Sequence, residues 1–417
     1  MSEPARKRRR KPERRIGSTL GQASLTEPPA ERQRVVSWRV AGLLGILSII
    51  TALAIYQLRL PAELASDSTR SQRPVPAETQ PQKTARSSKA WEKLIEVHFA
   101  GDQSCAECHA QIYQAHLRSG HSHTLTPMHE SPLAKQLIAA RQYDDLERDQ
   151  TLLFFNDDDQ FWVRDADQPA LPALPVTWLL GSGKHAQTPV AVDEATQSGV
   201  ELRWSFLANE QALGVTPDQE RFQHYHHQTR ESYGRPMDAD DIRACLGCHT
   251  TVGPPSQVPI QRDLYIPNVG CERCHGPRKK HVQLARQGRA EAAPPLLKYQ
   301  TAEAYMAVCS QCHRDENSVS PTAQPHELVR FQPYGLKRSR CYQADPQRMT
   351  CSACHDPHDA VSHDRATYIA NCQQCHAPQS DAQCKSQPVG DCITCHMPSV
   401  EWTAGIAFHD HWIRIPE

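Results

Sequence analysis

The stretch NVGCERCHGPRKKHV, residues 268–282, decides how this chain folds, because it holds two cysteines three positions apart and a histidine directly after the second. The Cys-x-x-Cys-His pattern occurs seven times: CAECH (105–109), CLGCH (245–249), CERCH (271–275), CSQCH (309–313), CSACH (351–355), CQQCH (372–376) and CITCH (392–396). The intervals between first cysteines are 140, 26, 38, 42, 21 and 20 residues. The chain therefore repeats a binding motif and not a structural unit of fixed period.

The pattern itself restricts what the motif binds. Fourteen of the 16 cysteines lie in these pairs, and a histidine follows every pair. Zinc sites need no histidine after each pair, a redox dithiol uses one pair on a thioredoxin-like scaffold, and iron–sulfur clusters use other spacings. Covalent haem c requires this arrangement, because two thiols join the porphyrin and the next imidazole binds the iron. The sequence therefore predicts seven covalent haems c.

Each motif supplies two attachment points and one proximal ligand. The predicted attachment points are Cys105, Cys108, Cys245, Cys248, Cys271, Cys274, Cys309, Cys312, Cys351, Cys354, Cys372, Cys375, Cys392 and Cys395. The predicted proximal ligands are His109, His249, His275, His313, His355, His376 and His396.

The sixth position of each iron needs a further ligand. The chain has 22 histidines, so 15 remain for seven irons, whereas its six methionines include the initiator. Because two histidine ligands leave the potential low, we expect mostly low-potential, bis-histidine haems. Any one of these histidines could instead lie on the surface or serve only in hydrogen bonding. The cluster at 224, 226 and 227 is a weaker candidate for a distal ligand than the histidines named next. The predicted distal ligands are His121, His185, His281, His358 and His411, followed by His123.

The N-terminus has a different composition from the rest of the chain. Residues 1–39 hold 11 Lys and Arg against four Asp and Glu, and residues 40–58 contain no charge. As a helix, those 19 residues would reach about 28 Å, close to the hydrocarbon thickness of a bilayer. By the positive-inside rule, we predict a basic cytoplasmic tail (1–39) and a transmembrane signal anchor (40–58).

Two other interpretations of this N-terminus were weighed against the anchor. A buried soluble helix fits poorly between flanking arginines, and a cleaved signal peptide lacks a good site, because PAELA places Glu63 where a small residue is required. The basic run alone suggests nucleic-acid binding, but beside an apolar span we expect no nucleic-acid partner. The predicted location is the inner membrane, single-pass, with the haem domain in the periplasm.

The remaining chain divides into a linker and one large domain. Residues 59–90 are rich in Pro, Ser and Gln, which predicts a disordered linker. Residues 91–417 form the predicted heptahaem domain. Within it, alternating stretches at 151–165 and 188–207 predict two hairpins and a β-rich insertion at about 145–215. The predicted fold is a mainly helical or irregular multihaem cytochrome c built around stacked haems, with this insertion and an N-terminal transmembrane helix.

Two cysteines, Cys341 and Cys384, lie outside the motifs. In an exported chain two remaining thiols predict a disulfide. The alternatives are two unpaired thiols or an unusual haem contact.

Several phrases around the motifs are more specific than the motif itself. SCAECHAQIY, GCERCHGPRKKHV, MTCSACHDPH and DCITCHMP resemble the cytochrome c-554 family of multihaem cytochromes, and more distantly hydroxylamine oxidoreductase and octahaem tetrathionate reductase. The resemblance covers about residues 100–412 and includes WLLGSGKHA and ELRWSF of the insertion. It implies haems stacked in close pairs, with distal histidines donated from other motifs' segments, and it supports His281 and His411 as ligands. The CxxCK motif of the nitrite- and tetrathionate-reducing relatives is absent from this sequence.

These observations favour electron transfer over catalysis. We expect a membrane-anchored periplasmic cytochrome that passes electrons from a quinol-linked donor or a periplasmic cytochrome to an acceptor. The alternative is a multihaem oxidoreductase that reduces or oxidises a small nitrogen or sulfur compound at one five-coordinate haem. A haem-based sensor is a third class, but no cytoplasmic signalling domain is present in the sequence.

Overall fold

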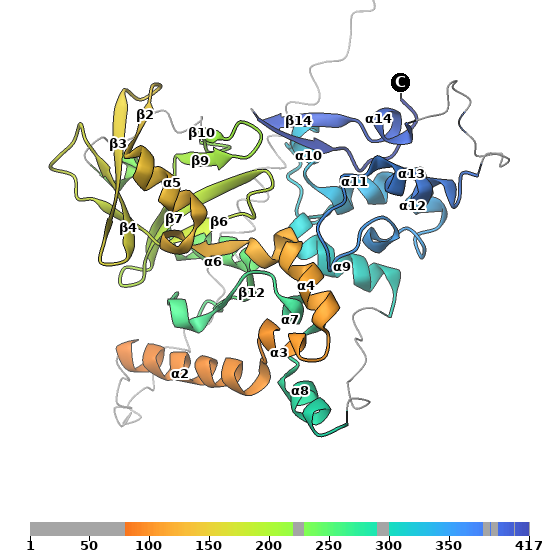
Figure 1. Cartoon of the computed structure of the whole chain (residues 1–417), viewed down its shortest axis with the longest axis horizontal. Helices are drawn as coiled ribbons and strands as arrows, with labels where there is room; N and C mark the ends of the chain where they lie inside the picture. The colour runs from red at the N-terminus through yellow and green to blue at the C-terminus, as the bar shows by residue number, and fades with distance from the viewer. Residues whose placement is uncertain are drawn as a thin grey trace, which may run out of the picture. The chain divides into compact units, whose positions relative to one another are not determined.

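The computed structural model describes residues 80–219, 229–289, 300–377, 384, 391–403 and 405–416 (Figure 1). The predicted tail, the predicted transmembrane anchor at 40–58 and the histidines at 224, 226 and 227 lie outside the described residues. Within those residues, no helix combines the length and the apolar character needed to cross a bilayer.

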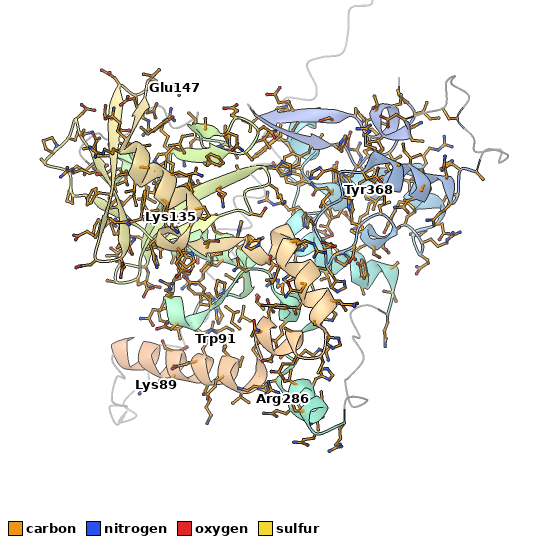
Figure 2. All side chains as sticks on the ribbon, viewed as in Figure 1. Lys89, Trp91, Lys135, Glu147, Arg286 and Tyr368 are labelled. Atoms are coloured by element: carbon orange, nitrogen blue, oxygen red, sulfur yellow. The ribbon has the colours of Figure 1, made fainter. Side chains whose placement is uncertain are left out.

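The first described element is α2 (Gln80–His98), which begins inside the range predicted to be a disordered linker. Its Lys, Ala, Arg and Gln residues are good helix formers, so a polar composition does not prevent a helix here. The indole Nε1 of Trp91 donates a hydrogen bond of 2.7 Å to the carbonyl of Leu264 (Figure 2). This contact with a residue 173 positions away fixes α2 on the rest of the domain.

The β-rich insertion contains a four-stranded antiparallel sheet in the order β2-β3-β4-β5. The predicted hairpin at 151–165 is confirmed, with Phe155 opposite Trp162 across β3 and β4. Buried residues alternate with mostly half-buried ones along both strands, because successive side chains of a strand point to opposite faces. The strands are β2 (Gln142–Asp145), β3 (Gln150–Asp157), β4 (Gln160–Asp165) and β5 (Leu174–Val176).

A second sheet of seven strands has the path β1-β6-β7-β8-β11, with β9 paired to β7 and β10 paired to β9. It extends beyond the predicted range of 145–215, because the short strands β1 and β11 flank that range. Both contain a proline and lie at the ends of the path, where a missing N–H is tolerated. The strands are β1 (Leu125–Pro127), β6 (Trp178–Leu180), β7 (Ala186–Asp193), β8 (Ser198–Leu202), β9 (Trp204–Leu207), β10 (Ala212–Val215) and β11 (Gly234–Met237).

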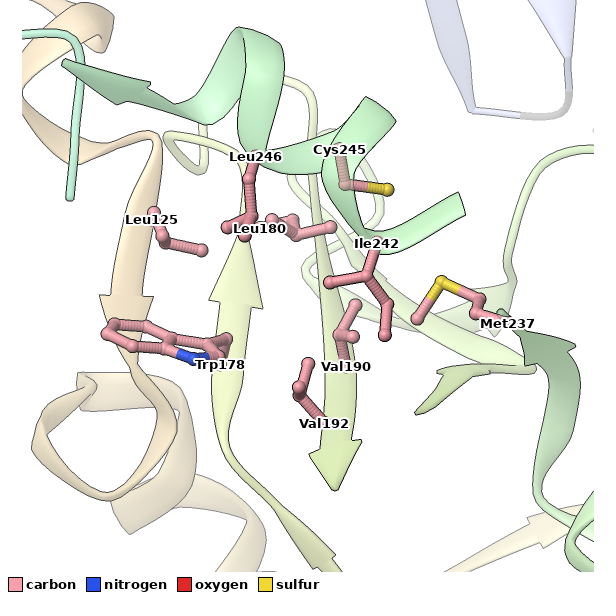
Figure 3. A pocket seen from close by; sticks show the side chains of 9 residues that line it. All are labelled: Leu125, Trp178, Leu180, Val190, Val192, Met237, Ile242, Cys245 and Leu246. Atoms are coloured by element: carbon pink, nitrogen blue, oxygen red, sulfur yellow. The ribbon is translucent and has the colours of Figure 1, made fainter. Parts of the chain in front are cut away.

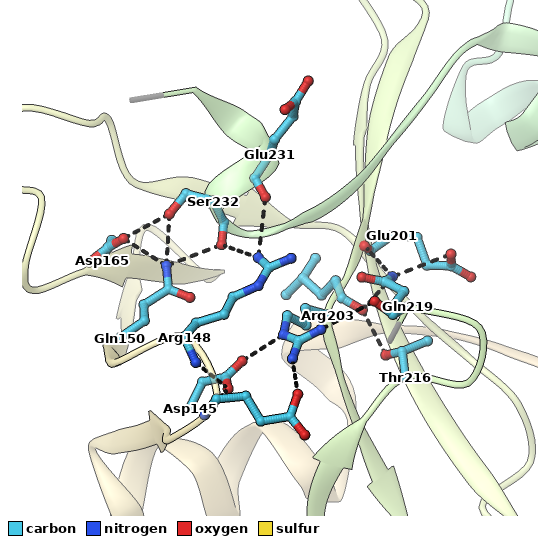
Figure 4. Close-up of polar contacts among 12 residues, drawn as sticks. Asp145, Arg148, Gln150, Asp165, Glu201, Arg203, Thr216, Gln219, Glu231 and Ser232 are labelled. Carbon is cyan, nitrogen blue, oxygen red and sulfur yellow. Dashed lines mark hydrogen bonds and ion pairs between the residues drawn. The ribbon is translucent and has the colours of Figure 1, made fainter. Parts of the chain in front are cut away.

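The predicted strand at 200–207 is interrupted at Arg203, which separates β8 from β9. Its guanidinium is buried and donates to Asp145 at 2.7 Å and to Glu147 at 2.5 Å (Figure 4). Beside it Gln150 donates to Asp165 at 2.7 Å. Buried polar groups cost free energy unless they are paired. The Arg203–Asp145 pair joins β2 to the larger sheet, and the Gln150–Asp165 pair joins β3 to β4.

The motif-bearing part consists of short helices and irregular segments. The elements on the N-terminal side are α3 (Asp102–Ala106), α4 (Ala110–Arg118), η1 (Gly120–His123), η2 (Met128–Glu130), α5 (Pro132–Ala140), η3 (Arg230–Ser232), α6 (Ala239–His249), β12 (Thr250–Val252), η4 (Arg262–Leu264), β13 (Ile266–Pro267), α7 (Cys271–His275) and α8 (Lys279–Arg286). Those after residue 300 are α9 (Ala302–His313), α10 (Pro325–Leu328), α11 (Gln332–Arg338), α12 (Arg340–Ala344), η7 (Cys351–Ala353), α13 (Arg365–Gln373), α14 (Cys392–His396), β14 (Ser399–Thr403) and β15 (Ile406–His409).

The chain up to residue 269 and the part after residue 300 differ in how many apolar side chains they bury. Of 36 buried apolar side chains among the described residues, 30 lie between Leu125 and Val269. The remaining six follow residue 300, although that region carries four of the seven motifs. Protein side chains alone thus supply a continuous core to the insertion and to the helix α6 packed on it, but only scattered buried positions to the C-terminal part.

Candidate functional site

Each of the seven motifs lies in a single helical turn. In the first, fifth and sixth motifs the histidine N–H donates to the carbonyl of the first cysteine, at 2.9, 3.0 and 2.9 Å. The others lie within α6, α7, α9 and α14. Positions i, i+3 and i+4 share one helix face, so this turn directs both thiols and the imidazole to one side. That is the arrangement covalent haem attachment requires.

The motifs lie next to one another in pairs. Helix α13 of the sixth motif packs against α14 of the seventh, and Arg365 bridges them by its 2.5 Å ion pair with Asp391. The thiols of the first five motifs make three contacts between different motifs: Cys105–Cys271, Cys248–Cys312 and Cys309–Cys351. The first motif thus neighbours the third, and the fourth neighbours both the second and the fifth.

The two residues between the cysteines of the third motif connect four motifs. Glu272 is 3% exposed and accepts hydrogen bonds from the backbone N–H groups of Ala100 (3.0 Å), Gly101 (2.9 Å) and Arg278 (2.7 Å), which ties it to the turn before the first motif. In return, Asp102 accepts from the N–H of Cys271 at 2.8 Å.

Arg273 extends the same connection to two further motifs. Its Nη2 donates to the carbonyl of Gly247, inside the second motif, at 2.8 Å, and to the side chain of Gln311, inside the fourth, at 3.2 Å. An arginine holds several acceptors in a fixed geometry. The third motif is therefore the junction of the first, second and fourth.

Three pairs of histidine rings face each other at one common separation. Each pair joins a predicted proximal ligand to a predicted distal ligand, with ring centroids 6.2, 6.0 and 6.2 Å apart: His313–His121, His275–His358 and His355–His411. Two imidazole nitrogens that bind one metal from opposite sides at about 2 Å each leave ring centroids about 6 Å apart. The residues present therefore fit bis-histidine ligation of iron at three motifs.

Hydrogen bonds at Nδ1 orient three of the predicted ligand rings, one of which belongs to a facing pair. The Nδ1 of His411 lies 2.9 Å from the carbonyl of His409, and the Nδ1 atoms of His249 and His396 lie 2.8 Å from the carbonyls of Thr124 and Arg414. A ligating histidine usually donates its second N–H in this way, which fixes the tautomer and leaves Nε2 for the metal.

In two of the facing pairs a side-chain oxygen accepts the hydrogen bond at Nδ1 and so orients the ring. The Nδ1 of His313 lies 3.3 Å from Oε1 of Gln332, and the Nδ1 of His358 lies 3.2 Å from Oδ1 of Asp356. Burial lowers the pKa of His121 and of His411 to about 4. Both imidazoles are therefore neutral at pH 7, as metal ligation requires.

The structure separates the two candidates that follow the first motif. His121 faces His313, whereas His123 is engaged through Nε2, which lies 2.9 Å from the carbonyl of Leu117. His123 therefore has its Nε2 occupied by the backbone, and His121 is the better ligand.

His281 lies on α8, which is attached to the first motif. Arg286 of the same helix pairs with Glu107, between the cysteines of CAECH, through contacts of 2.5 and 3.0 Å. The Nδ1 of His281 is buried and has no hydrogen-bond partner. The Arg286–Glu107 contact places the C-terminal end of α8 beside the first motif. His185, between β6 and β7, instead has its ring centroid 4.8 Å from that of Phe408 in β15.

One buried histidine was not predicted from the sequence. His116, on α4, is 7% exposed and its Nε2 has no hydrogen-bond partner. Burial lowers its pKa, so this imidazole is neutral, and it lies near His358. In the sequence it is indistinguishable from an ordinary helix residue. The roles of Glu272 and Arg273 were also missed, although two charged residues between the cysteines of CERCH were a visible signal.

The second motif differs from the others in its apolar surroundings. Cys245 points into a pocket whose other walls include Trp178, Leu180, Val190 and Ile242 (Figure 3). Burial raises the pKa of its thiol to about 11. The β-rich insertion thus forms one wall of this attachment site.

The two cysteines outside the motifs are not joined. Both Cys341 and Cys384 are free thiols, Cys384 being exposed, and Cys341 lies near Cys354 and Cys375 of the fifth and sixth motifs. The predicted disulfide between them is therefore not formed in this structure.

Parts of the chain are similar to known cytochromes. Residues 204–276 match the protein-family model Cytochrome c554 and c-prime. The multiheme cytochrome MtrA of Shewanella baltica (strain OS185) is 28% identical over 147 residues, which cover 30% of this chain and 41% of that protein. The chain thus spans less than half the length of this relative. The crystal structure of outer cell wall cytochrome OcwA aligns with 76% of this chain and 79% of its own, at 13% identity and a TM-score of 0.43.

The repeated attachment turns and the facing histidines define a multihaem c-type cytochrome. The matched segment contains the complete second and third motifs. Over that segment the chain is similar to the cytochrome c554 family of multihaem c-type cytochromes.

Proposed function

We propose that this chain binds seven haems c and transfers electrons along them. The observation that carries the proposal is the set of three facing histidine pairs, because an iron held by two histidines has no open position for a substrate. When bound, the haems supply one-electron redox chemistry at potentials set by their axial ligands and surroundings. The residues of the chain attach, orient and space them.

We assign three axial pairs from these contacts: His313 with His121, His275 with His358, and His355 with His411. We further assign His281 to the iron bound by His109, since the ion pair between Arg286 and Glu107 holds α8 against the first motif. His185 remains the proposed distal ligand of a further motif, and His116 joins the candidates because its buried Nε2 lacks a partner.

The spacing of the motifs supports a route for electrons. Thiol contacts join the first motif to the third, the second motif to the fourth, and the fourth motif to the fifth, and Arg273 connects these two groups. Covalently attached haems follow their motifs, so neighbouring motifs keep neighbouring haems close. We infer that the third motif joins the two branches of the route.

The cellular setting is part of the same proposal. The apolar run at 40–58 would anchor the chain in the inner membrane with the haem domain in the periplasm, next to a quinol-linked donor or periplasmic cytochromes and away from nucleic acid. Protease treatment of intact and of lysed spheroplasts tests this orientation. Digestion of the haem domain only after lysis would contradict it.

The direct test of the function is a haem count combined with spin states. The pyridine haemochrome assay should give seven haems per chain, and electron paramagnetic resonance of the oxidised protein should show all seven as low-spin ferric iron. One high-spin signal that changes on addition of nitrite or sulfite would favour the alternative, a multihaem oxidoreductase with a five-coordinate haem. A haem count near zero would overturn both functions.

A further inference from the structure

The rings of Phe331 and Trp402 hold two arginines beside the fourth motif. Arg314 directly follows the proximal ligand His313, and its guanidinium carbon lies 5.3 Å from the ring centroid of Phe331. The guanidinium carbon of Arg330 lies 5.1 Å from the same centroid and 4.3 Å from that of Trp402. Two cations therefore share one aromatic residue.

Aromatic rings stabilise a guanidinium through its face but leave its N–H groups unsatisfied. The Nε of Arg330 is buried and has no hydrogen-bond partner, and within the described part of the chain its side chain forms no ion pair. The negative charges of Asp218 and Glu327 raise the pKa of Arg330, whereas the positive charge of Arg314 lowers it. Burial lowers the pKa of the Arg330 guanidinium, which indicates that these carboxylates do not offset the cost of desolvation.

Arg414 of the same region shows what is missing here. Arg414 stacks on Trp412 at 4.4 Å and pairs with Asp410 at 2.6 Å. Arg330 has the aromatic contacts without the carboxylate. A half-buried guanidinium beside a second one is costly unless an anion compensates it, and a guanidinium matches a carboxylate or a similar oxyanion through two parallel N–H groups.

We propose that Arg330 and Arg314 form a binding site next to the fourth motif for a small oxyanion that offers two oxygens side by side. Two sources supply this chemistry: a propionate of a bound haem, or a free small oxyanion from solution. The position favours an anion close to the iron site, because Gln332, which follows Phe331, has its Oε1 3.3 Å from Nδ1 of His313. The propionate source rests on the proposed haem binding, whereas the free-anion source does not.

The test compares the haem-loaded wild type with Arg330→Met. The matched control is Arg348→Met, because Arg348 is exposed and its ion pair among the described residues is with Asp345. Spectroelectrochemical titration measures the haem potentials, and calorimetric titration with sulfite, nitrite and acetate measures anion binding. Haem counts of all variants are measured first, so a failure of haem attachment is detected separately.

If the anion is a propionate, loss of the positive charge lowers one midpoint potential. We expect about a tenfold change in that reduction equilibrium, which is about 59 mV for one electron, with no anion binding by the wild type. If the anion is free, the wild type binds one sulfite, nitrite or acetate per chain, and Arg330→Met weakens the affinity at least tenfold while the potentials measured without anion stay unchanged.

Equal potentials and equal anion affinities in wild type and Arg330→Met would overturn the proposal. Because that variant could lose stability with the aromatic stacking, Arg330→Lys is tested in parallel, since it keeps the charge but not the two-pronged geometry. We expect Arg330→Lys to change the same quantity as Arg330→Met, either the reduction equilibrium of one haem or the anion affinity, in the same direction and by at least threefold. If Arg330→Lys and Arg314→Met both behave as the wild type, the site does not exist, whatever Arg330→Met shows.

Discussion

The β-rich insertion and the C-terminal motif region achieve order by different means. The insertion buries large apolar side chains such as Phe161, Leu202 and Trp204 between its sheets and joins the sheets through the paired Arg203. The region after residue 300 has six buried apolar side chains for four motifs. From this difference we infer that the insertion folds on its own apolar core, whereas the motif region needs the proposed haems to complete its core.

The largest expected effect is therefore the loss of haem attachment. In a chain produced without the haem-attachment machinery, we expect the strands β3, β4 and β7 to keep slow amide exchange while α9 to α14 exchange as an unfolded chain does. Hydrogen exchange followed by mass spectrometry measures both regions in one sample. Equal protection in both regions would break the comparison.

Within the insertion, the largest single-residue effect is expected at Trp204, which is 1% exposed and whose ring lies 5.2 Å from that of Phe154. Truncating a buried tryptophan leaves a cavity, so Trp204→Ala should lower the free energy of unfolding by about 3–5 kcal/mol. Denaturant unfolding followed by the remaining tryptophan fluorescence measures this loss. Trp162→Ala on β4 is the control: Trp162 is only half-buried, so its loss should cost less.

In the motif region, a buried polar residue should matter more than an apolar one. Glu272→Gln replaces an acceptor of three backbone N–H groups with an amide that has one oxygen, and we expect a loss of about 1–3 kcal/mol. Thermal unfolding monitored in the Soret band measures it. The same substitution at exposed Glu92 on α2 should change nothing. If both variants unfold at the same temperature as the wild type, the third motif is not the junction of its neighbours.

The smallest expected effect is a pH dependence of the insertion. The pKa of Asp193 is lowered, chiefly by the backbone N–H of Thr196, with Ala195 and Arg230 adding to it against the opposing effect of burial. A carboxylate with a lowered pKa stabilises the folded state above its unfolded pKa, about 3.9, and this stabilisation disappears as the pH falls through the folded value.

Asp193→Asn should therefore unfold at a slightly higher pH than the wild type. The free energies of unfolding of the two proteins should become similar once the pH lies below the pKa of Asp193 in the folded state. Acid titration followed by near-ultraviolet circular dichroism measures the shift. Asp158→Asn, in the exposed β3–β4 turn, is the matched control and should leave the acid transition in place.

How much of this was predictable depends on the distance over which residues act. The seven motifs and the hairpin of β3 and β4 are local patterns, and the sequence predicts both. The partners of the distal histidines are not local: His121 faces His313, and His411 faces His355, across segments whose spacing carries no information about contact. The outer strands β1 and β11 escaped prediction because each is short and contains a proline, and His116 because burial of a helical histidine leaves no trace in the sequence.

The central claim is that particular histidines, and not merely the motifs, set the coordination of the irons. The measurement that tests it most directly compares electron paramagnetic resonance spectra of His121→Ala and His123→Ala, two residues apart in the same η1 segment. We predict that His121→Ala converts one of seven low-spin ferric signals to high-spin, while His123→Ala leaves all seven unchanged. An unchanged spectrum for His121→Ala, or a high-spin signal from His123→Ala alone, would contradict the account.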